Sequence, residues 1–307
     1  MTVKRYRIII AVLALIMLAA FAGCNTHTKR ESEPEETGAW RLMKETVYAF
    51  RGRKLSEVNY VYDEKGNLTK VLTCKADGTV KEWTEYENDE NGNAIKVRAY
   101  DADGSITGLE DFEYDANGNE IAHKSYDADG KITLWLEYEN DANGNLTKLT
   151  LFNADGSINS RMEFTLDANG NTIGSLDFDA HGNLLRRYES RRDANGNLIE
   201  STTYSANGNM GYRSVFEYDE NGHLSKEMQF RADGSLLNHT ELTYDANGNT
   251  TMKKSYDADG NIRDWHETEY DENGNKTLYK EYNADGNVQQ RTEYEWQYFE
   301  NAPKTKK

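Results

Sequence analysis

Trp and Arg recur at one position of a regular sequence pattern, and both side chains are common where proteins bind sugars, acidic polymers or other proteins. The position is the fifth after the glycine that precedes each ten-residue segment. It holds Trp83, Leu109, Trp135, Arg161, Arg187, Arg213, His239, Trp265 and Arg291. We expect a ligand-binding ladder formed by Trp83, Trp135, Arg161, Arg187, Arg213, Trp265 and Arg291. The alternative is structural, with Arg neutralising nearby Glu and Trp covering the second face of a rolled sheet.

Other reactive residue types do not form a catalytic pattern. The histidines fall at unrelated places in the pattern, which predicts scattered surface positions. Glutamates recur at the seventh position of the same segments: Glu85, Glu137, Glu163, Glu189, Glu241, Glu267 and Glu293. A repeated column of this kind indicates a solvated face rather than one tuned acid–base pair. We therefore predict no catalytic residues and no enzyme activity.

Aspartate-rich segments such as Asp115–Asn119 also suggest calcium loops. A helix–loop–helix calcium site places Gly sixth and Glu twelfth, whereas here Gly is fourth and a strand segment follows. Turn chemistry already accounts for the Asp, Asn and Gly. We predict no metal and no cofactor, with calcium binding as the open alternative.

These residues are positioned by a strict internal repeat. From Gly66 to Gly286 the glycines of the pattern are spaced alternately by 12 and 14 residues, which gives nine copies of a 26-residue unit. Gly52 lies 14 residues before Gly66 and follows Tyr48 in register, so a degenerate half-unit opens the array. A repeat of this length indicates an architecture built from stacked copies of one small unit.

Each glycine closes a tight turn, spelled DANGN or DENGN in one half of the unit and DADG in the other. Asp bonds the backbone two residues on, and Gly accepts the positive φ that ends a type I turn with a glycine bulge. Nineteen such turns predict about twenty antiparallel strands. The two prolines, Pro34 and Pro303, lie outside the array. This is expected, because proline has no backbone N–H to donate to a strand ladder.

The segments between turns carry strand patterns. The second residue of each ten-residue segment is aliphatic or Met, as in Ile106, and the last residue of each eight-residue segment is aromatic, as in Tyr100, except at Cys74. A three-residue hairpin places these two residues opposite each other. We expect them to share a core face with the eighth and tenth positions, as in Phe112 and Tyr114, and we expect the fifth and seventh positions on the other face.

The motifs YDANGN at Tyr114–Asn119 and Tyr244–Asn249, and YDENGH at Tyr218–His223, resemble those of the YD-repeat, or Rhs-type, family of bacterial and toxin-associated β-repeats. The resemblance covers roughly residues 48–300 and implies a long strip of antiparallel strands wound into a shell. The strict 26-residue double unit departs from that family, as does the lack of a recognisable self-cleaving region or toxin. We therefore expect an all-β, repetitive antiparallel β-hairpin array of about 20 strands, coiled into a curved or spiral shell or solenoid.

The first residues predict export. Lys4, Arg5 and Arg7 precede an apolar run over residues 8–21, which is shorter than a membrane-spanning helix needs. The sequence then reads Phe-Ala-Gly-Cys at residues 21–24, which resembles the lipobox of bacterial lipoproteins and implies lipidation of Cys24. Phe21 departs from the usual Leu, and the alternative is an ordinary secretory signal.

Four segments follow from these patterns: a lipoprotein signal peptide at 1–23, a lipidated Cys with a flexible tether at 24–38, the β-repeat domain at 39–300 and a basic tail at 301–307. Cleavage takes the formal charge from −17 to −20, which argues against nucleic acid as a partner. We expect a lipid-anchored protein on the exported side of the cell envelope, held to the membrane by its lipid. Its expected role is a non-catalytic binding or adhesion scaffold for polysaccharide or a surface protein. The alternatives are a structural spacer and a secreted carbohydrate-active hydrolase.

Overall fold

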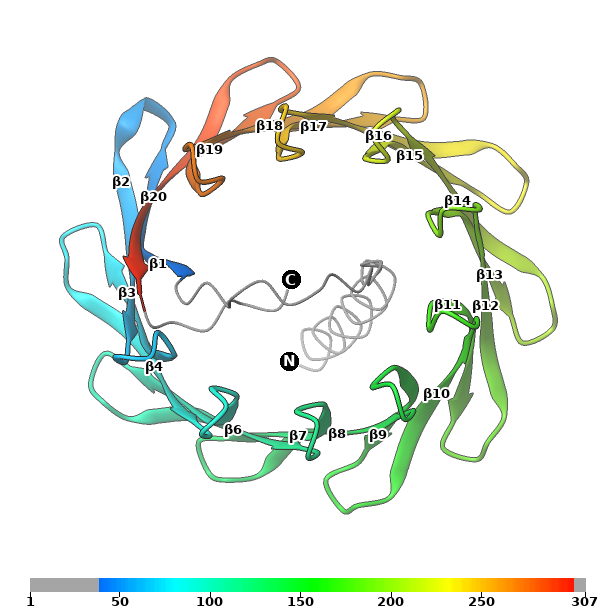
Figure 1. Ribbon diagram of the computed structural model, residues 1–307, viewed down its shortest axis with the longest axis horizontal. Helices are drawn as coiled ribbons and strands as arrows, with labels where there is room; N and C mark the ends of the chain where they lie inside the picture. Colours follow the sequence, from blue (N-terminus) through cyan, green and yellow to red (C-terminus); the bar gives the residue numbers. More distant parts are fainter. Residues whose placement is uncertain (1–38, 301–307) are drawn as a thin grey trace.

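The computed structural model describes residues 39–300, which form one antiparallel sheet of 20 strands. Each strand pairs with its neighbours in chain order, and the first strand, β1 (Ala39–Ala49), also pairs with the last, β20 (Val288–Phe299). The sheet therefore closes into a barrel (Figure 1). The prediction of about twenty antiparallel strands is confirmed, whereas the prediction of an open curved or spiral shell is wrong. Closure pairs the two edges that an open array would leave exposed.

Long and short strands alternate around the ring. The long strands between the ends are β2 (Lys54–Tyr62), β4 (Val80–Asn88), β6 (Ile106–Tyr114), β8 (Ile132–Asn140), β10 (Ile158–Leu166), β12 (Leu184–Arg192), β14 (Met210–Tyr218), β16 (Leu236–Tyr244) and β18 (Ile262–Tyr270). The short strands are β3 (Leu68–Lys75), β5 (Ala94–Asp101), β7 (Glu120–Asp127), β9 (Leu146–Phe152), β11 (Thr172–Asp179), β13 (Leu198–Ser205), β15 (Leu224–Phe230), β17 (Thr250–Asp257) and β19 (Lys276–Asn283). A single 3₁₀ turn, η1 (Phe50–Gly52), joins β1 to β2. Successive turns thus lie at alternate ends of the barrel.

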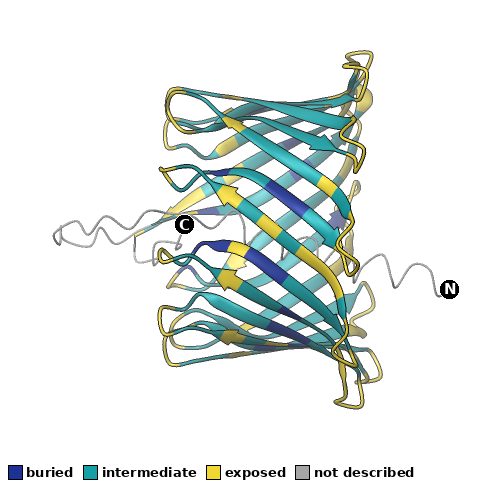
Figure 2. Ribbon diagram, turned by 90° about the vertical axis from the view of Figure 1, so that its right-hand side faces the viewer, coloured by how far each residue is buried: buried dark blue, intermediate teal, exposed yellow. Residues whose placement is uncertain are grey.

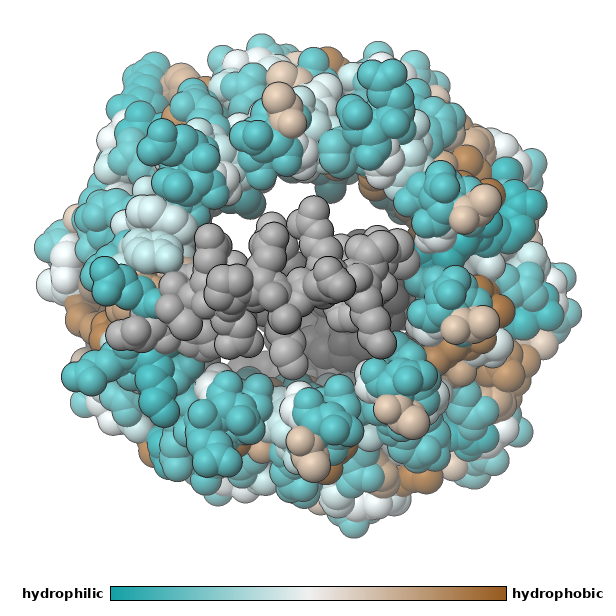
Figure 3. Space-filling model, viewed as in Figure 1, coloured by the Kyte–Doolittle hydropathy of each residue, from teal (hydrophilic) through white to brown (hydrophobic). Residues whose placement is uncertain are grey.

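The turns have the predicted chemistry. In the turn that joins β6 to β7, the Gly118 N–H donates to the Asp115 carbonyl at 3.0 Å, and Gly118 has φ +80°. The Asp115 Oδ1 atom accepts hydrogen bonds from the backbone N–H of Asn117 and of Asn119, each at 2.9 Å. The same arrangement recurs around the ring because every repeat glycine has a positive φ between +76° and +87°. The turns at both ends of the barrel are mostly exposed (Figure 2). At the end of the barrel that faces the viewer in Figure 3, these turn residues are largely hydrophilic.

A bulge beside each DADG-type turn changes which side chains share a face. Tyr100 pairs with Ile106 as predicted, but the next pair is Ala99 with Gly108, which leaves Thr107 without a partner. The unpaired residue shifts the alternation of the long strand by one position. Tyr100 consequently shares a face with the fifth and seventh positions, and Phe112 at the eighth position lies on the other face. The prediction that Tyr100 and Phe112 share one core face is therefore wrong for the half of the unit that contains the DADG-type turn.

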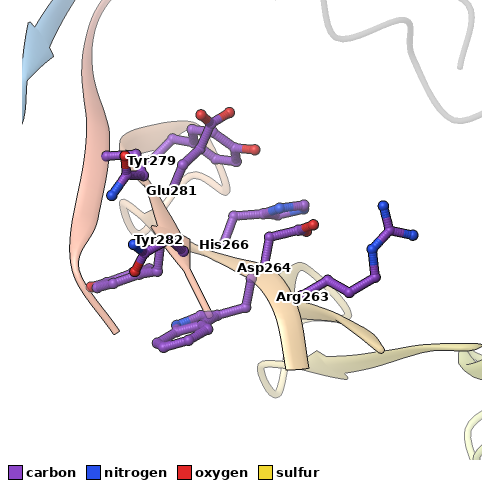
Figure 4. Close-up of a pocket in the computed structure, with 9 residues that line it drawn as sticks. Arg263, Asp264, His266, Tyr279, Glu281 and Tyr282 are labelled. Carbon is purple, nitrogen blue, oxygen red and sulfur yellow. The ribbon is translucent and has the colours of Figure 1, made fainter. Parts of the chain in front are cut away.

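One of these faces lines the inside of the barrel. Around β18 and β19, the side chains of Asp264, His266, Tyr279 and Glu281 point to the inside and Tyr282 points away from it (Figure 4). By repeat position, the inner face also carries Leu136, which forms the buried hydrophobic cluster with Leu149 and Met162 on β8, β9 and β10. Leu136 and Leu149 are each only 2% exposed. Among residues 39–300, no helix is long and apolar enough to cross a membrane.

The predicted signal peptide, the tether with Cys24, and the basic tail lie outside the described residues.

A belt of stacked side chains as the candidate functional site

The fifth-position side chains lie directly over the aromatic side chains of the following short strands, on the outer face. In four units two rings stack: Trp83 on Tyr100 at 5.0 Å, Trp135 on Phe152 at 4.8 Å, His239 on Tyr256 at 4.4 Å and Trp265 on Tyr282 at 4.9 Å between ring centroids. The planes of His239 and Tyr256 differ by only 3°. We call the row formed by the fifth-position residues and their cross-strand partners the belt.

We call each fifth-position residue together with its cross-strand partner a station of the belt. Arginines take the fifth position in four further stations, with the same geometry. Their guanidinium carbons lie over rings at 4.2 Å (Arg161 on Phe178), 4.5 Å (Arg187 on Tyr204), 5.3 Å (Arg213 on Phe230) and 4.6 Å (Arg291 on Tyr48). The last of these contacts joins β20 to β1, so the belt runs without interruption across the closing seam. Cross-strand pairs of Leu109 with Tyr126 and of Glu57 with Cys74 complete the ring.

Two indole rings in the belt are contacted from both sides. The Lys70 ammonium lies 5.0 Å from the Trp83 ring and the Lys124 ammonium lies 4.4 Å from the Trp135 ring. Lys70 is on β3 and Tyr100 is on β5, so Trp83 on β4 lies between a cation and an aromatic ring. A ligand that approaches from outside therefore meets the edges of these indoles rather than their faces.

The predicted glutamate column lies beside the belt and pairs with it. Arg161 Nε contacts Glu163 at 2.9 Å and Arg291 contacts Glu293 at 2.7 Å. Trp135 Nε1 donates to Glu137 at 3.2 Å. These pairs are solvent-exposed in part, so each contributes about 1 kcal/mol or less to stability.

The glutamates also act on the tyrosines of the belt. The Tyr282 hydroxyl donates to Glu267 Oε2 at 2.7 Å, and burial together with this carboxylate raises the pKa of Tyr282 to about 12. Burial likewise raises the pKa of Tyr256, which donates to Glu241. Tyr256 and Tyr282 consequently remain protonated hydrogen-bond donors at neutral pH.

Three polar atoms in the belt are buried without a hydrogen-bond partner among the described residues: Trp83 Nε1, His239 Nδ1 and Arg291 Nε. Buried donors and acceptors are paired in most proteins, because leaving one unpaired costs free energy. Two further atoms of this kind, Asp111 Oδ1 and Arg192 Nε, lie outside the belt.

The structure brings all seven predicted ladder residues into the belt, and Cys24 lies outside the described residues. The ladder shares its face with the aromatic column instead of opposing it. Sequence reasoning missed the stacking partners as part of the site, because it assigned Tyr100, Tyr204 and their equivalents to a separate core face. The recurrence of Trp, Arg and His, which all stack on aromatic rings, was the available signal.

Sequence reasoning also missed a cavity of about 440 Å³ at β18 and β19, whose lining includes Asp264, His266, Tyr279 and Glu281 (Figure 4). Trp265 and Tyr282 of the belt also line it, but no periodic signal marks His266, Tyr279 and Glu281, because the other units carry different residues at these positions.

A family model described as MORN repeat variant matches residues 214–232, which run from β14 through β15. Curated protein sequences give no match.

Several solved structures are similar to parts of the chain at low identity. The TcdB2-TccC3-Cdc42 structure is 13% identical, covers 76% of this chain and 18% of its own, and has a TM-score of 0.25. A porin-like protein from Bacteroides uniformis is 11% identical, with 83% of this chain and 98% of its own covered and a TM-score of 0.37. A DUF3836 family protein from Parabacteroides distasonis is 16% identical, with 37% and 90% covered and a TM-score of 0.18. The chain thus spans less than a fifth of the toxin-complex chain that it matches.

Proposed function

We propose that this chain is a non-catalytic binding scaffold of the YD-repeat type, anchored to the exported side of the cell envelope by lipid on Cys24. The observation that carries the binding role is the belt, which presents Trp, Tyr and Arg at stations repeated around a closed ring. Its ligand is a polysaccharide or a surface protein.

Repetition supports a polymer with a repeated structure. Successive belt stations lie two strands apart, roughly 10 Å given the spacing of strands in a sheet. A chain of sugar units can contact several stations at once, and contacts that are weak singly then add. The indole edges and the guanidinium groups offer it hydrogen bonds and apolar surface.

A structural spacer is the second candidate, and one observation favours it. Lys70 and Tyr100 already cover the two faces of the Trp83 ring, so this belt residue is occupied by contacts within the wall. If the belt serves only to hold neighbouring strands together, it stabilises the ring and binds no ligand.

The two candidates are separated by replacing Trp83, Trp135 and Trp265 with Ala in the full-length chain. We expect the triple variant to lose retention on insoluble glycans and isolated cell walls while its far-ultraviolet circular dichroism stays that of a β protein. A variant with Trp replaced by Leu at the same sites keeps apolar bulk and guards against misfolding.

The matched control replaces Leu55, Leu185 and Tyr212, which are exposed side chains outside the belt, with Ala. This control should bind as the parent does. Equal retention by the belt variants and the parent would reject binding through the belt and leave the spacer.

A further inference from the structure

The cavity at β18 and β19 adjoins the belt, because Trp265 and Tyr282 are among the residues that line it, but most of its lining lies outside the belt. Asp264 and His266 come from β18, and Tyr279 and Glu281 come from β19, where His266 and Glu281 are directly opposite each other. All four side chains lie on the inner side of the sheet (Figure 4). Its volume of about 440 Å³ falls within the usual range for small-molecule sites.

The pocket contains a small aromatic platform. The rings of His266 and Tyr279 lie 5.2 Å apart at an angle of 42°. Burial lowers the pKa of His266 and raises the pKa of Tyr279 to about 12. At neutral pH the platform therefore offers an uncharged imidazole and a protonated phenol, which donate and accept hydrogen bonds without carrying charge.

Carboxylates and amides surround this platform. Asp264 and Glu281 contribute acceptor oxygens, and Asn283 and Gln289 contribute amides that both donate and accept. Arg263 is a cation at the border of the same cavity. Hydroxyl groups can donate to the carboxylates and accept from the amides, whereas a second carboxylate near Asp264 and Glu281 would be repelled.

We propose that this pocket on the inner wall is a second carbohydrate subsite, which binds one or two units of an uncharged sugar. The aromatic platform faces the apolar side of a sugar ring, and the carboxylates and amides bind its hydroxyls. This inference rests on the proposed binding function, and it assigns to the inside of the barrel a site separate from the outer contacts of Trp83 and Trp135.

The test uses the full-length chain purified in detergent, with saturation-transfer NMR and calorimetry as readouts. The probes are cellobiose, N,N′-diacetylchitobiose and, as an anionic counterpart, digalacturonic acid. The variants Glu281→Gln and Tyr279→Phe each remove one polar function with little change in shape. Glu227→Gln, on the inner face of β15 and outside the lining of this cavity, is the matched control.

We expect at least one uncharged disaccharide to bind the parent chain, and each pocket variant to bind it about tenfold more weakly. The control Glu227→Gln should bind the disaccharide as the parent does. Digalacturonic acid should not bind. Retention of polymer by the parent chain with no uncharged disaccharide bound, or with pocket variants that bind as tightly as the parent, overturns the inner subsite alone. Preferred binding of digalacturonic acid also overturns it. Absence of any polymer retention by the parent overturns the proposed function itself.

Discussion

The guanidinium of Arg291 lies 4.6 Å from the ring of Tyr48, and this contact joins the last strand of the barrel to the first. The same contact is made inside the array by Arg187 on Tyr204 at 4.5 Å. β1 takes the place of a short strand in the alternation, although it has 11 residues, and β20 takes the place of a long one, so the two ends fit together as two neighbouring units do. The seam of the barrel is therefore a copy of its internal junctions.

Loss of the seam contact should have a local effect. We expect Arg291→Ala and Arg187→Ala to lower the free energy of unfolding by similar amounts, about 1 kcal/mol, since both remove a cation–π contact at a partly exposed site. Only Arg291→Ala should also speed amide hydrogen exchange in β1, because Arg187 is remote from the seam. Equal exchange in β1 for both variants would show that Arg291 does not hold the seam.

Two turn glycines provide a matched test of crowding between repeats. A Cβ added to Gly144 would lie 2.7 Å from Asn119 Oδ1, whereas a Cβ added to Gly118 meets nothing within 4 Å, although φ is positive at both. Ala at either position costs about 1–2 kcal/mol of backbone strain. We expect Gly144→Ala to be the more destabilising in urea unfolding. The reverse order would mean that the turns of adjacent units do not pack as the structure shows.

The inner wall has a buried side chain whose truncation should be costly. Leu149 is 2% exposed, and Leu149→Ala should lower the free energy of unfolding by about 2–5 kcal/mol through lost packing and a residual cavity. Leu185 is 47% exposed, and Leu185→Ala should change it by no more than about 0.5 kcal/mol. Comparable losses in the two variants, measured by urea unfolding, would contradict the burial at β9.

Acid should weaken the barrel through its turns. Hydrogen bonds from the side chains of Asn119 and Asn145 hold the pKa of Asp115 and of Asp141 below the usual range. A carboxyl whose pKa is lower in the folded state stabilises that state above the unfolded pKa, about 3.9, and the stabilisation is lost as the pH falls through the folded pKa. Burial raises the pKa of Glu120 and of Asp177, which opposes the trend at these two sites. We expect a lower urea midpoint at pH 3 than at pH 6, and an unchanged midpoint would contradict this account of the turns.

Chelation should have no comparable effect. The Asp115 Oδ1 atom already accepts two backbone hydrogen bonds, and Asp141 and Asp245 do the same in their turns. We expect the thermal midpoint to be the same with and without a calcium chelator. A decrease on chelation would revive the calcium alternative.

Local chemistry made the turns and strands predictable. Gly118 and its equivalents specify the hinge, and the pairing of Tyr100 with Ile106 follows from the length of the loop. The bulge at Thr107 was not predictable in the same way, because nothing about Thr marks it as unpaired. That single residue moves Leu109, at the fifth position, from the face opposite Tyr100 to the face that Tyr100 occupies.

Closure of the barrel depends on a contact between the first and last strands, which the sequence of a single repeat does not reveal. Tyr48 in the opening half-unit was already in register with the aromatic column, and Arg291 stood at a fifth position with no short strand after it. Together these two residues form a complete station, which is a signal for a ring. The inner pocket offered no such signal, since His266 and Glu281 are brought together by the sheet and not by a repeated pattern.

Crosslinking of β1 to β20 tests the closed ring most directly. Lys44 and Glu295 are cross-strand neighbours at the seam and form a 2.7 Å ion pair. With both replaced by Cys, in a background of Cys24→Ser and Cys74→Ala, a short bismaleimide should join the two ends within one chain and change its migration on a denaturing gel. A pair at Lys44 and Lys148, on strands far apart around the ring, should remain unlinked. Failure of the seam pair to link within one folded chain would contradict the closed barrel.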